Sequence, residues 1–270
     1  MLKQRILTAV VLAPLVLCGV FLLGLEGFAV FFAIVTLIGA WEWARLSGFT
    51  DNSSRIAYSA VVAAALGIAW WLNAQGWAVL LLAPALIFWC LGFFWIAKYP
   101  STKHWSPVLT RAAIGVLFLV AAWLSLLQIK AYEHGNAWLL LMLLVVWAAD
   151  IGAYFSGKRW GSVKLAPAVS PGKTREGLYG GLVAVVFTSI VFSLWNELSI
   201  LETVYLAMMC FIVGAVSVMG DLLESMLKRH AGIKDSGSIL PGHGGVLDRV
   251  DSILAAAPFF YMGLFFLPSM

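Results

Sequence analysis

Nine apolar segments, each close to the length that crosses a bilayer, follow one another along the chain. A membrane-spanning helix needs about 20 predominantly apolar residues. Only 11% of the 270 residues are charged, against roughly a quarter in a soluble domain, so lipid must form part of the solvent. The segments comprise residues 6–23, 27–41, 56–72, 77–97, 112–129, 137–156, 177–195, 203–220 and 252–267.

These segments predict an all-α polytopic membrane protein with about nine transmembrane helices in a single integral-membrane domain, residues 1–270. The first segment follows a short basic stretch without a small-residue cleavage site, so we expect a retained helix rather than a signal peptide. The most polar parts of the chain, residues 150–177 and 220–251, are predicted to carry the catalytic residues.

Basic residues indicate on which side of the membrane each loop lies, because cytoplasmic loops carry an excess of Lys and Arg. With the N-terminus inside and the segments alternating, Lys130 is the only one of the 17 basic residues that falls outside. This asymmetry supports the nine-segment arrangement and predicts an external C-terminus. Residues 157–176 and 221–251 are separated by two segments, so both are expected at the cytoplasmic face, where nucleotides are found.

A polar stripe continues directly from the eighth segment. Asp221, Glu224, Ser225 and Lys228 follow the spacing i, i+3, i+4, i+7, which places them on one face of a helix. Ionisable groups at a membrane boundary are costly, and those that persist usually have a function. The stripe is therefore predicted to belong to a site rather than to a lipid-facing surface.

A glycine-rich loop and a second acidic group follow this stripe. Residues 241–245, Pro-Gly-His-Gly-Gly, cannot form regular helix, and their glycines allow a ligand to approach main-chain N–H groups. Asp248, Arg249 and Asp251 then open the last segment, with the two aspartates at i and i+3. We expect His243 to organise the loop or to contact phosphate rather than to act as a general base.

The acidic residues of this region favour a hard cation. Asp221, Asp248 and Asp251 offer oxygen ligands, and no cysteine lies beside them. Mg²⁺ is the natural choice, because it binds through one or two carboxylates together with substrate phosphates. The alternative for Asp248 and Asp251 is capping of the last helix at its N-terminus. Their combination with Asp221 and several basic residues favours the metal.

A second polar segment, residues 164–177, precedes the seventh apolar segment. It places Lys173 and Arg175 in a loop rich in proline and glycine, and Ser170 and Thr174 add hydrogen-bond donors. Such a loop suits phosphate oxygens, although the G-x-x-x-x-G-K spacing of a Walker A loop is absent. The alternative is that these charges only set the membrane topology.

Asp150 is the third candidate, because it lies near the end of an apolar run that starts at Ala137. An isolated carboxylate within such a run is a functional candidate by default, and the alternative is structural pairing with a Lys or Arg. Composition and spacing alone thus predict a cytoplasmic site for an anionic ligand, with Mg²⁺.

The polar pattern at the C-terminal end resembles the signature of the phosphatidate cytidylyltransferase family. It reads Ser225-x-x-Lys228-Arg229-x4-Lys234-Asp235-x5-Pro241-x-His243-Gly244-Gly245-x-x-Asp248-Arg249-x-Asp251. Two upstream patterns are similar to further motifs of that family: Asp150-x-x-Ala153-Tyr154 and Ser170-Pro171-x-Lys173-Thr174-x-Glu176-Gly177. The resemblance extends over the whole chain in length and helix pattern.

The resemblance implies transfer of CMP from CTP to phosphatidate, giving CDP-diacylglycerol and pyrophosphate for phospholipid biosynthesis, with a divalent cation. It also implies a multi-pass protein of the cell inner membrane, a homodimer and no nucleic-acid partner. Asp221 and Asp248 match the metal-binding aspartates of the family, and with Lys228, Arg249 and Asp251 they are the catalytic candidates. The substrate-binding candidates are Asp150, Ser170, Lys173, Thr174, Arg175, Ser225, Arg229, Lys234, His243, Gly244 and Gly245.

This chemistry needs no Ser/His/Asp or Cys/His arrangement, because a phosphate monoester is already ionised near neutral pH. The main barrier is the approach of two polyanions, which metal ions and Lys or Arg side chains lower. Three other functions would also use parts of this pattern. A transporter of an anion would favour an inverted repeat, which is not visible. A CDP-alcohol phosphotransferase would carry a D-G-x-x-A-R…G-x-x-x-D-x-x-x-D pattern, which is absent. A CTP-dependent lipid kinase would share the nucleotide and the metal.

Overall fold

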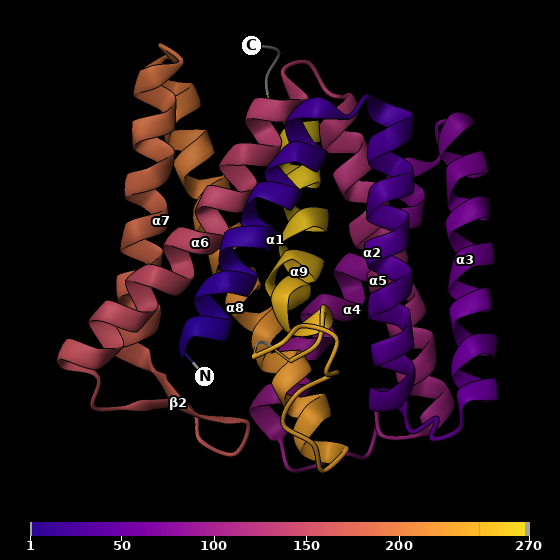
Figure 1. Cartoon of the computed structure of the whole chain (residues 1–270). Coiled ribbons are helices and arrows are strands. Elements are labelled where there is room, and N and C mark those ends of the chain that lie inside the picture. Colours follow the sequence, from indigo (N-terminus) through magenta and orange to yellow (C-terminus); the bar gives the residue numbers. More distant parts are fainter. Residues whose placement is uncertain (1, 243, 268–270) are drawn as a thin grey trace.

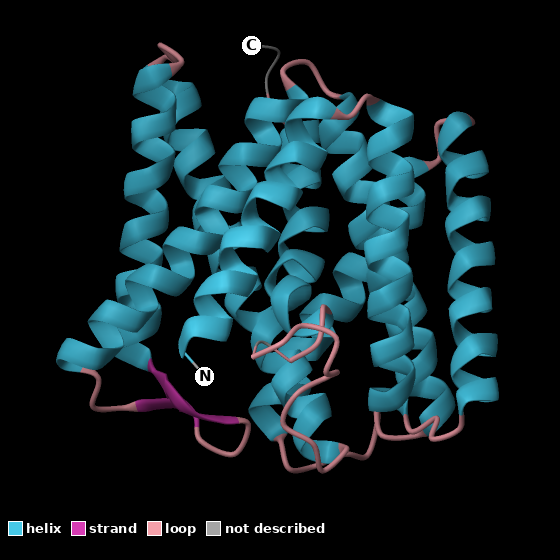
Figure 2. Cartoon of the chain, in the orientation of Figure 1, coloured by secondary structure: helices cyan, strands magenta, loops and turns pink. Residues whose placement is uncertain are grey.

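The protein is a helical bundle with one short β-hairpin (Figures 1 and 2). The computed structural model describes residues 2–242 and 244–267, and side chains from Val10 onward. Within these residues the helices are α1 (Leu2–Leu22), α2 (Leu25–Ser47), α3 (Asn52–Ala74), α4 (Ala78–Lys98), α5 (Val108–Ala131), α6 (Gly135–Trp160), α7 (Arg175–Trp195), α8 (Ile200–His230) and α9 (Leu247–Phe265). The hairpin consists of β1 (Lys164–Ala166) and β2 (Ser170–Thr174), which pair antiparallel.

The predicted fold class is confirmed, because each apolar segment of the sequence coincides with one helix of the described chain. Seven of these helices, α2 to α8, are long and apolar enough to cross a membrane. The main differences lie at the polar ends. Helix α8 runs ten residues beyond its predicted end at residue 220, since the polar stripe keeps helical spacing. Residues 164–174, predicted as a loop, form the hairpin instead.

Helix α5 lies at the centre of the bundle and is the most buried of the candidate spans. Its packing against α2 and α3 satisfies polar groups inside the bundle. The indole Nε1 of Trp43 donates to the carbonyl of Arg111 (2.9 Å), and the Tyr58 hydroxyl donates to the carbonyl of Ala112 (3.0 Å). The guanidinium of Arg111 donates to the carbonyl of Leu46 (3.0 Å). Such pairing matters because lipid offers these groups no partner.

Glycines allow two pairs of helices to touch backbone to backbone. A Cβ at Gly181 of α7 would lie 2.6 Å from the carbonyl oxygen of Ala149 on α6. A Cβ at Gly220 of α8 would lie 2.5 Å from the carbonyl oxygen of Asp251 on α9. Small residues commonly permit this approach in membrane helices. The first contact holds α7 against α6, which carries Asp150, and the second holds α9 against α8, which carries Asp221.

The polar segments of the chain gather at one end of the bundle. Figure 1 shows β2 and the long connection between α8 and α9 at the same lower end of the molecule, although the hairpin and the connection are far apart in sequence. The fold therefore brings the two predicted catalytic segments, residues 150–177 and 220–251, to the same end.

Candidate active site

The end of α8 carries the predicted polar stripe on one face. The Ser225 hydroxyl donates to Oδ1 of Asp221 (3.2 Å), and Lys228 Nζ contacts Oε2 of Glu224 (2.7 Å). Both contacts join residues four apart, as the helical spacing predicts. Lys228 Nζ also lies 2.7 Å from Oδ1 of Asp248, so one ammonium group links α8 to α9.

The carboxylate of Asp248 organises the loop that precedes α9. Its Oδ2 accepts three hydrogen bonds, from the amide of Ser236 (3.0 Å), the Ser236 hydroxyl (2.9 Å) and the amide of Gly245 (2.7 Å). Gly244 has φ +82°, and a Cβ there would lie 2.6 Å from Oδ2 of Asp248. The N-cap residue of α9 is Val246, which makes no side-chain cap. Asp248 therefore holds the loop in place, which is more than a capping role.

The β-hairpin is attached to α8 at two points. Lys173 Nζ lies 2.8 Å from Oδ2 of Asp221, and Nε of Arg229 donates to the carbonyl of Val169 (3.3 Å). At the start of α7, the hydroxyl of Thr174 accepts the amide N–H of Gly177 (3.1 Å), which caps the helix. The two polar segments thus meet through one ion pair between side chains and one hydrogen bond from a side chain to the main chain.

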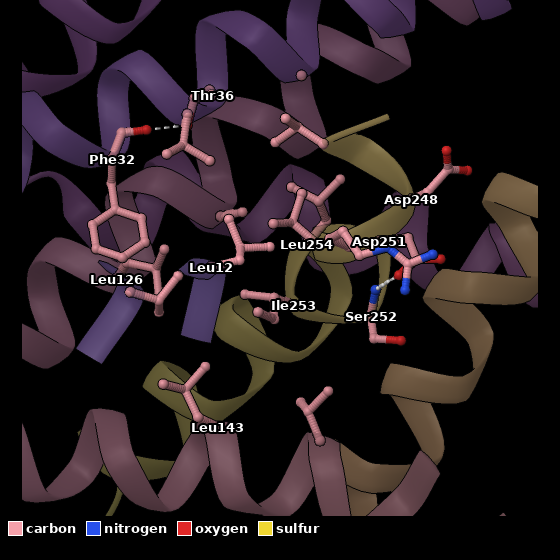
Figure 3. A pocket seen from close by; sticks show the side chains of 18 of the residues that line it. Leu12, Phe32, Thr36, Leu126, Leu143, Asp248, Asp251, Ser252, Ile253 and Leu254 are labelled. Atoms are coloured by element: carbon pink, nitrogen blue, oxygen red, sulfur yellow. Dashed lines mark hydrogen bonds between the residues drawn. The ribbon is translucent and has the colours of Figure 1, made fainter. Parts of the chain in front are cut away.

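One cavity of about 810 Å³ joins the charged residues to an apolar space between helices. Apolar side chains of α1, α2, α5 and α6 form most of its wall, and Figure 3 shows Leu12, Phe32 and Leu126 on one side, with Asp248 and Asp251 on the other. The charged residues that line its polar end are Asp150, Asp221, Lys228, Asp235, Asp248, Arg249 and Asp251. The site can therefore accept a molecule with an apolar part and a charged part. Because five of these seven residues are aspartates, an anionic part would contact Lys228, Arg249 or a cation that the aspartates hold.

Asp150 lines the polar end of this cavity, near the charges of Lys173, Asp221 and Arg249. Lys173, one of these basic residues, has its ammonium group 2.8 Å from Oδ2 of Asp221. The position of Asp150 brings α6 into the same site as α8 and α9.

Other predicted substrate-binding residues lie around the cavity rather than in its wall. Arg175 and Lys234 are exposed, Ser170 begins β2, and Thr174 is buried with its hydroxyl engaged in the cap of α7. Gly244 and Gly245 belong to the loop that Asp248 holds. His243 lies outside the described residues. Contact of these residues with substrate stays a prediction.

Two residues beyond those predicted take part in the site. Ser236 is fully buried and contacts Asp248. Glu42 of α2 is 1% exposed; its carboxylate contacts the hydroxyl of Ser236 and accepts the amide N–H of Leu247. Glu42 carries a signal that could have revealed it, since it is an ionisable residue just after an apolar segment. Ser236 carries none, because its burial depends on the path of the loop.

The charged residues would fit a magnesium ion that takes most of its ligands from substrate phosphates. In the described part of the chain, no three His, Cys, Asp or Glu side chains form a metal-binding group by themselves. Mg²⁺ needs only one or two carboxylates when phosphates supply the other ligands. Asp221 and Asp248 each present an oxygen to a lysine ammonium group at 2.7–2.8 Å, so positive charge is already stabilised at both positions.

Comparison with known proteins agrees with this arrangement. The model of the cytidylyltransferase family matches residues 3–267. The chain is 46% identical over 261 residues to a phosphatidate cytidylyltransferase of Pseudomonas aeruginosa, which covers 96% of both chains. It is 38% identical over 291 residues to that of Haemophilus influenzae, which covers 98% of this chain and 99% of the relative. The chain therefore belongs to the cytidylyltransferase family and is a nucleotidyltransferase.

Proposed function

We propose that this protein is a CTP:phosphatidate cytidylyltransferase, which transfers CMP from CTP to phosphatidate and releases pyrophosphate. The observation that carries the proposal is one cavity that has both a charged end and apolar walls. Phosphatidate has the same two parts, a phosphate monoester and two acyl chains. Its headgroup can reach the charged end while its chains stay among the apolar side chains of α1, α2, α5 and α6.

The reaction needs no strong base. An ionised phosphate oxygen of phosphatidate attacks the α-phosphorus of CTP, and a new P–O bond forms. The bond between the α-phosphorus and the bridging oxygen breaks, and pyrophosphate leaves with the electron pair. Lys228 and Arg249 line the charged end of the cavity, and Lys173 pairs with Asp221 at that end. Their charges would offset the repulsion between the two polyanions.

We further propose that Asp221 and Asp248 hold Mg²⁺. When bound, the cation would supply neutralisation of the phosphate charges and would orient the phosphates for in-line attack. The protein itself fixes both carboxylates in advance. Asp221 is held by Ser225 and Lys173, and Asp248 by the loop amides and Lys228. Preorganised groups of this kind avoid the cost of ordering them during the reaction.

The location follows from the topology argument. We propose a multi-pass protein of the cell inner membrane, with the site facing the cytoplasm, where CTP is available. The clustering of the polar segments at one end of the bundle supports a single active face. A homodimer, which the family resemblance implies, is part of the proposal.

The product of the reaction tests this function. Purified protein in detergent is incubated with phosphatidate and CTP that is labelled either at the α- or at the γ-phosphate. We expect the α-label in CDP-diacylglycerol and the γ-label in pyrophosphate. In a parallel incubation with diacylglycerol in place of phosphatidate, transfer of the γ-label to lipid would identify a lipid kinase instead. Absence of any lipid product, together with uptake of an anion into vesicles, would identify a transporter.

A further inference from the structure

A buried carboxylate on α2 binds the catalytic loop from outside the two polar segments. Oε1 of Glu42 accepts the amide N–H of Val246 (3.1 Å), and Oε2 accepts the amide N–H of Leu247 (2.7 Å). These amides lie at the point where the loop becomes α9. The N-cap residue of α9, Val246, has no side chain that can accept these N–H groups. Glu42 therefore supplies the acceptor from a different helix.

Ser236 connects this carboxylate to the proposed metal-binding aspartate. Its hydroxyl lies 3.2 Å from Oε2 of Glu42 and 2.9 Å from Oδ2 of Asp248. Its amide N–H donates to the same Oδ2 of Asp248. Asp248 in turn contacts Lys228. A continuous chain of contacts thus runs from α2, through the loop, to the charged end of the cavity.

The backbone around Glu42 is shaped for this side chain. A Cβ at Gly237 would lie 2.2 Å from Oε1, and a Cβ at Gly245 would lie 2.4 Å from Oε2. Only glycine leaves enough room for the carboxylate to sit between these two parts of the loop. Glu42 itself is 1% exposed, so its charge is kept from water and lipid by groups that donate hydrogen bonds to it.

We propose that Glu42 is a positioning residue of the active site, which fixes the loop at Ser236 and Val246, the start of α9 at Leu247 and, through Ser236, the carboxylate of Asp248. The expected effect on turnover rests on the proposed function, whereas the expected effect on loop order does not. Lipid-facing helices alone would not hold a glycine-rich loop in one conformation, because glycines lose the most conformational freedom on ordering. The hydrogen bonds from the loop to the buried carboxylate of Glu42 on α2 offset that loss of conformational freedom.

Two substitutions at Glu42 test the inference in the full-length protein in detergent. Glu42→Gln replaces one acceptor oxygen by an amide that would face a main-chain N–H, and Glu42→Asp keeps the charge but shortens the reach. The matched control is Arg111→Met, which removes another buried charged group that contacts α2. Ser236→Ala, alone and combined with Glu42→Gln, tests the connection between them.

The kinetic readout is turnover at saturating substrate, measured with thermal stability. We expect Glu42→Gln to lower kcat by about 10- to 100-fold, as the loss of an outer partner of a metal ligand typically does. Glu42→Asp should recover part of that loss. Arg111→Met should lower thermal stability without a comparable loss of kcat. The double variant with Ser236→Ala should lose little more than Glu42→Gln, because both changes break the same chain.

A second readout does not depend on catalysis. A nitroxide label at Ser238→Cys, an exposed position of the loop, reports loop mobility after the three native cysteines are replaced. Glu42→Gln should increase this mobility, and Arg111→Met should not. If the unmodified protein makes no CDP-diacylglycerol, the proposed function fails, and the label alone decides whether Glu42 orders the loop.

Three results would overturn the proposal. The first is a Glu42→Gln variant with kcat within about twofold of wild type, well below the expected effect. The second is an equal loss of kcat in Arg111→Met and Glu42→Gln when the two variants have the same thermal stability. That result would mean that Glu42 only stabilises the fold. The third is full additivity with Ser236→Ala, which would place the two residues on separate paths. If Glu42→Gln does not fold, Glu42→Asp and Ser236→Ala decide by the same criteria.

Discussion

Lys173 of the β-hairpin and Asp221 of α8 form an ion pair, with 2.8 Å between Nζ and Oδ2. The two side chains are 25% and 32% exposed, so the pair lies where an incoming anion can reach it. The contact joins segments that the sequence separates by a whole helix, α7, and part of another, α8. It links the two polar segments through two charged side chains and places an ammonium group beside the proposed metal ligand.

Removal of either of two positive charges of the site, Lys173 or Arg249, should impair the reaction. We expect Lys173→Ala and Arg249→Ala each to lower kcat/KM for CTP, because each charge offsets polyphosphate repulsion. The loss of one charged hydrogen bond costs about 2–3 kcal/mol, which corresponds to roughly 30- to 150-fold. Lys164→Ala is the control, since Lys164 is an exposed lysine of the same hairpin, on β1, whereas Lys173 is partly buried against Asp221. Unchanged kinetics in both Lys173 and Arg249 variants would leave these charges with a topological role only.

The carboxylates of the site should be indispensable. We expect Asp221→Asn and Asp248→Asn to abolish turnover while the protein still inserts and folds, because the amide removes the anionic oxygens that Mg²⁺ prefers. Asp51→Asn is the matched control. Asp51 caps α3 through the amide of Ser54 (2.7 Å), and asparagine caps helices equally well. Activity is measured across a magnesium titration, and wild-type activity of either site variant at low magnesium would exclude that residue as a ligand.

His243 should not be an essential general base. Phosphatidate brings an already ionised nucleophile, so no proton has to be removed. If His243 were the base, its loss should cost at least about 100-fold. We expect His243→Gln to retain measurable activity and to keep the acidic limb of the pH–rate profile. Complete inactivation of the folded variant, or loss of that limb, would assign the proton transfer to His243.

The topology predicts which loops face the cytoplasm. Single cysteines at Ser238→Cys, in the loop before α9, and at Glu133→Cys, between α5 and α6, should react with a membrane-impermeant reagent from opposite sides. Both positions are exposed. The native cysteines, Cys18, Cys90 and Cys210, are first replaced. Labelling of both positions from the same side of sealed vesicles would contradict the nine-segment arrangement.

Close packing of α8 and α9 should be sensitive to a single methyl group. Gly220→Ala places a Cβ 2.5 Å from the carbonyl oxygen of Asp251, so α9 must move. Overpacking of this kind costs about 1–3 kcal/mol, and the shift should also lower activity. Gly67→Ala in α3 meets nothing within 4 Å and should leave stability unchanged or raise it by up to about 1 kcal/mol. Thermal unfolding in detergent and turnover measure both effects, and equal behaviour of the two variants would contradict the packing argument.

The basic residue expected outside the membrane has a structural explanation. Lys130 Nζ donates to the carbonyl of Val20 (2.6 Å) and to Oδ1 of Asn136 (2.5 Å). Carbonyls near a helix C-terminus have no intrahelical partner, and Lys130 satisfies one at the end of α1. This charge therefore needs no partner from substrate, and the exception to the charge asymmetry is consistent with the predicted topology.

The sequence by itself determined the helices and the chemical character of the site. Apolar length marks a membrane helix because each span must bury its backbone hydrogen bonds within itself. The polar stripe from Asp221 to Lys228 was predictable for the same reason, since its spacing is local and follows the helical period. The motifs also identified Asp150, Lys173 and Asp248 as candidates before any contact was known.

Only the tertiary structure decided which of these residues meet. The contacts of Lys173 with Asp221 and of Lys228 with Asp248 depend on how helices pack, and packing is governed by side-chain volume and glycine placement rather than by local period. Glu42 illustrates the limit most clearly. Its sequence neighbours mark it only as an ionisable residue in an apolar helix, and its hydrogen bonds to Val246 and Leu247 exist because α2 and α9 come together in space.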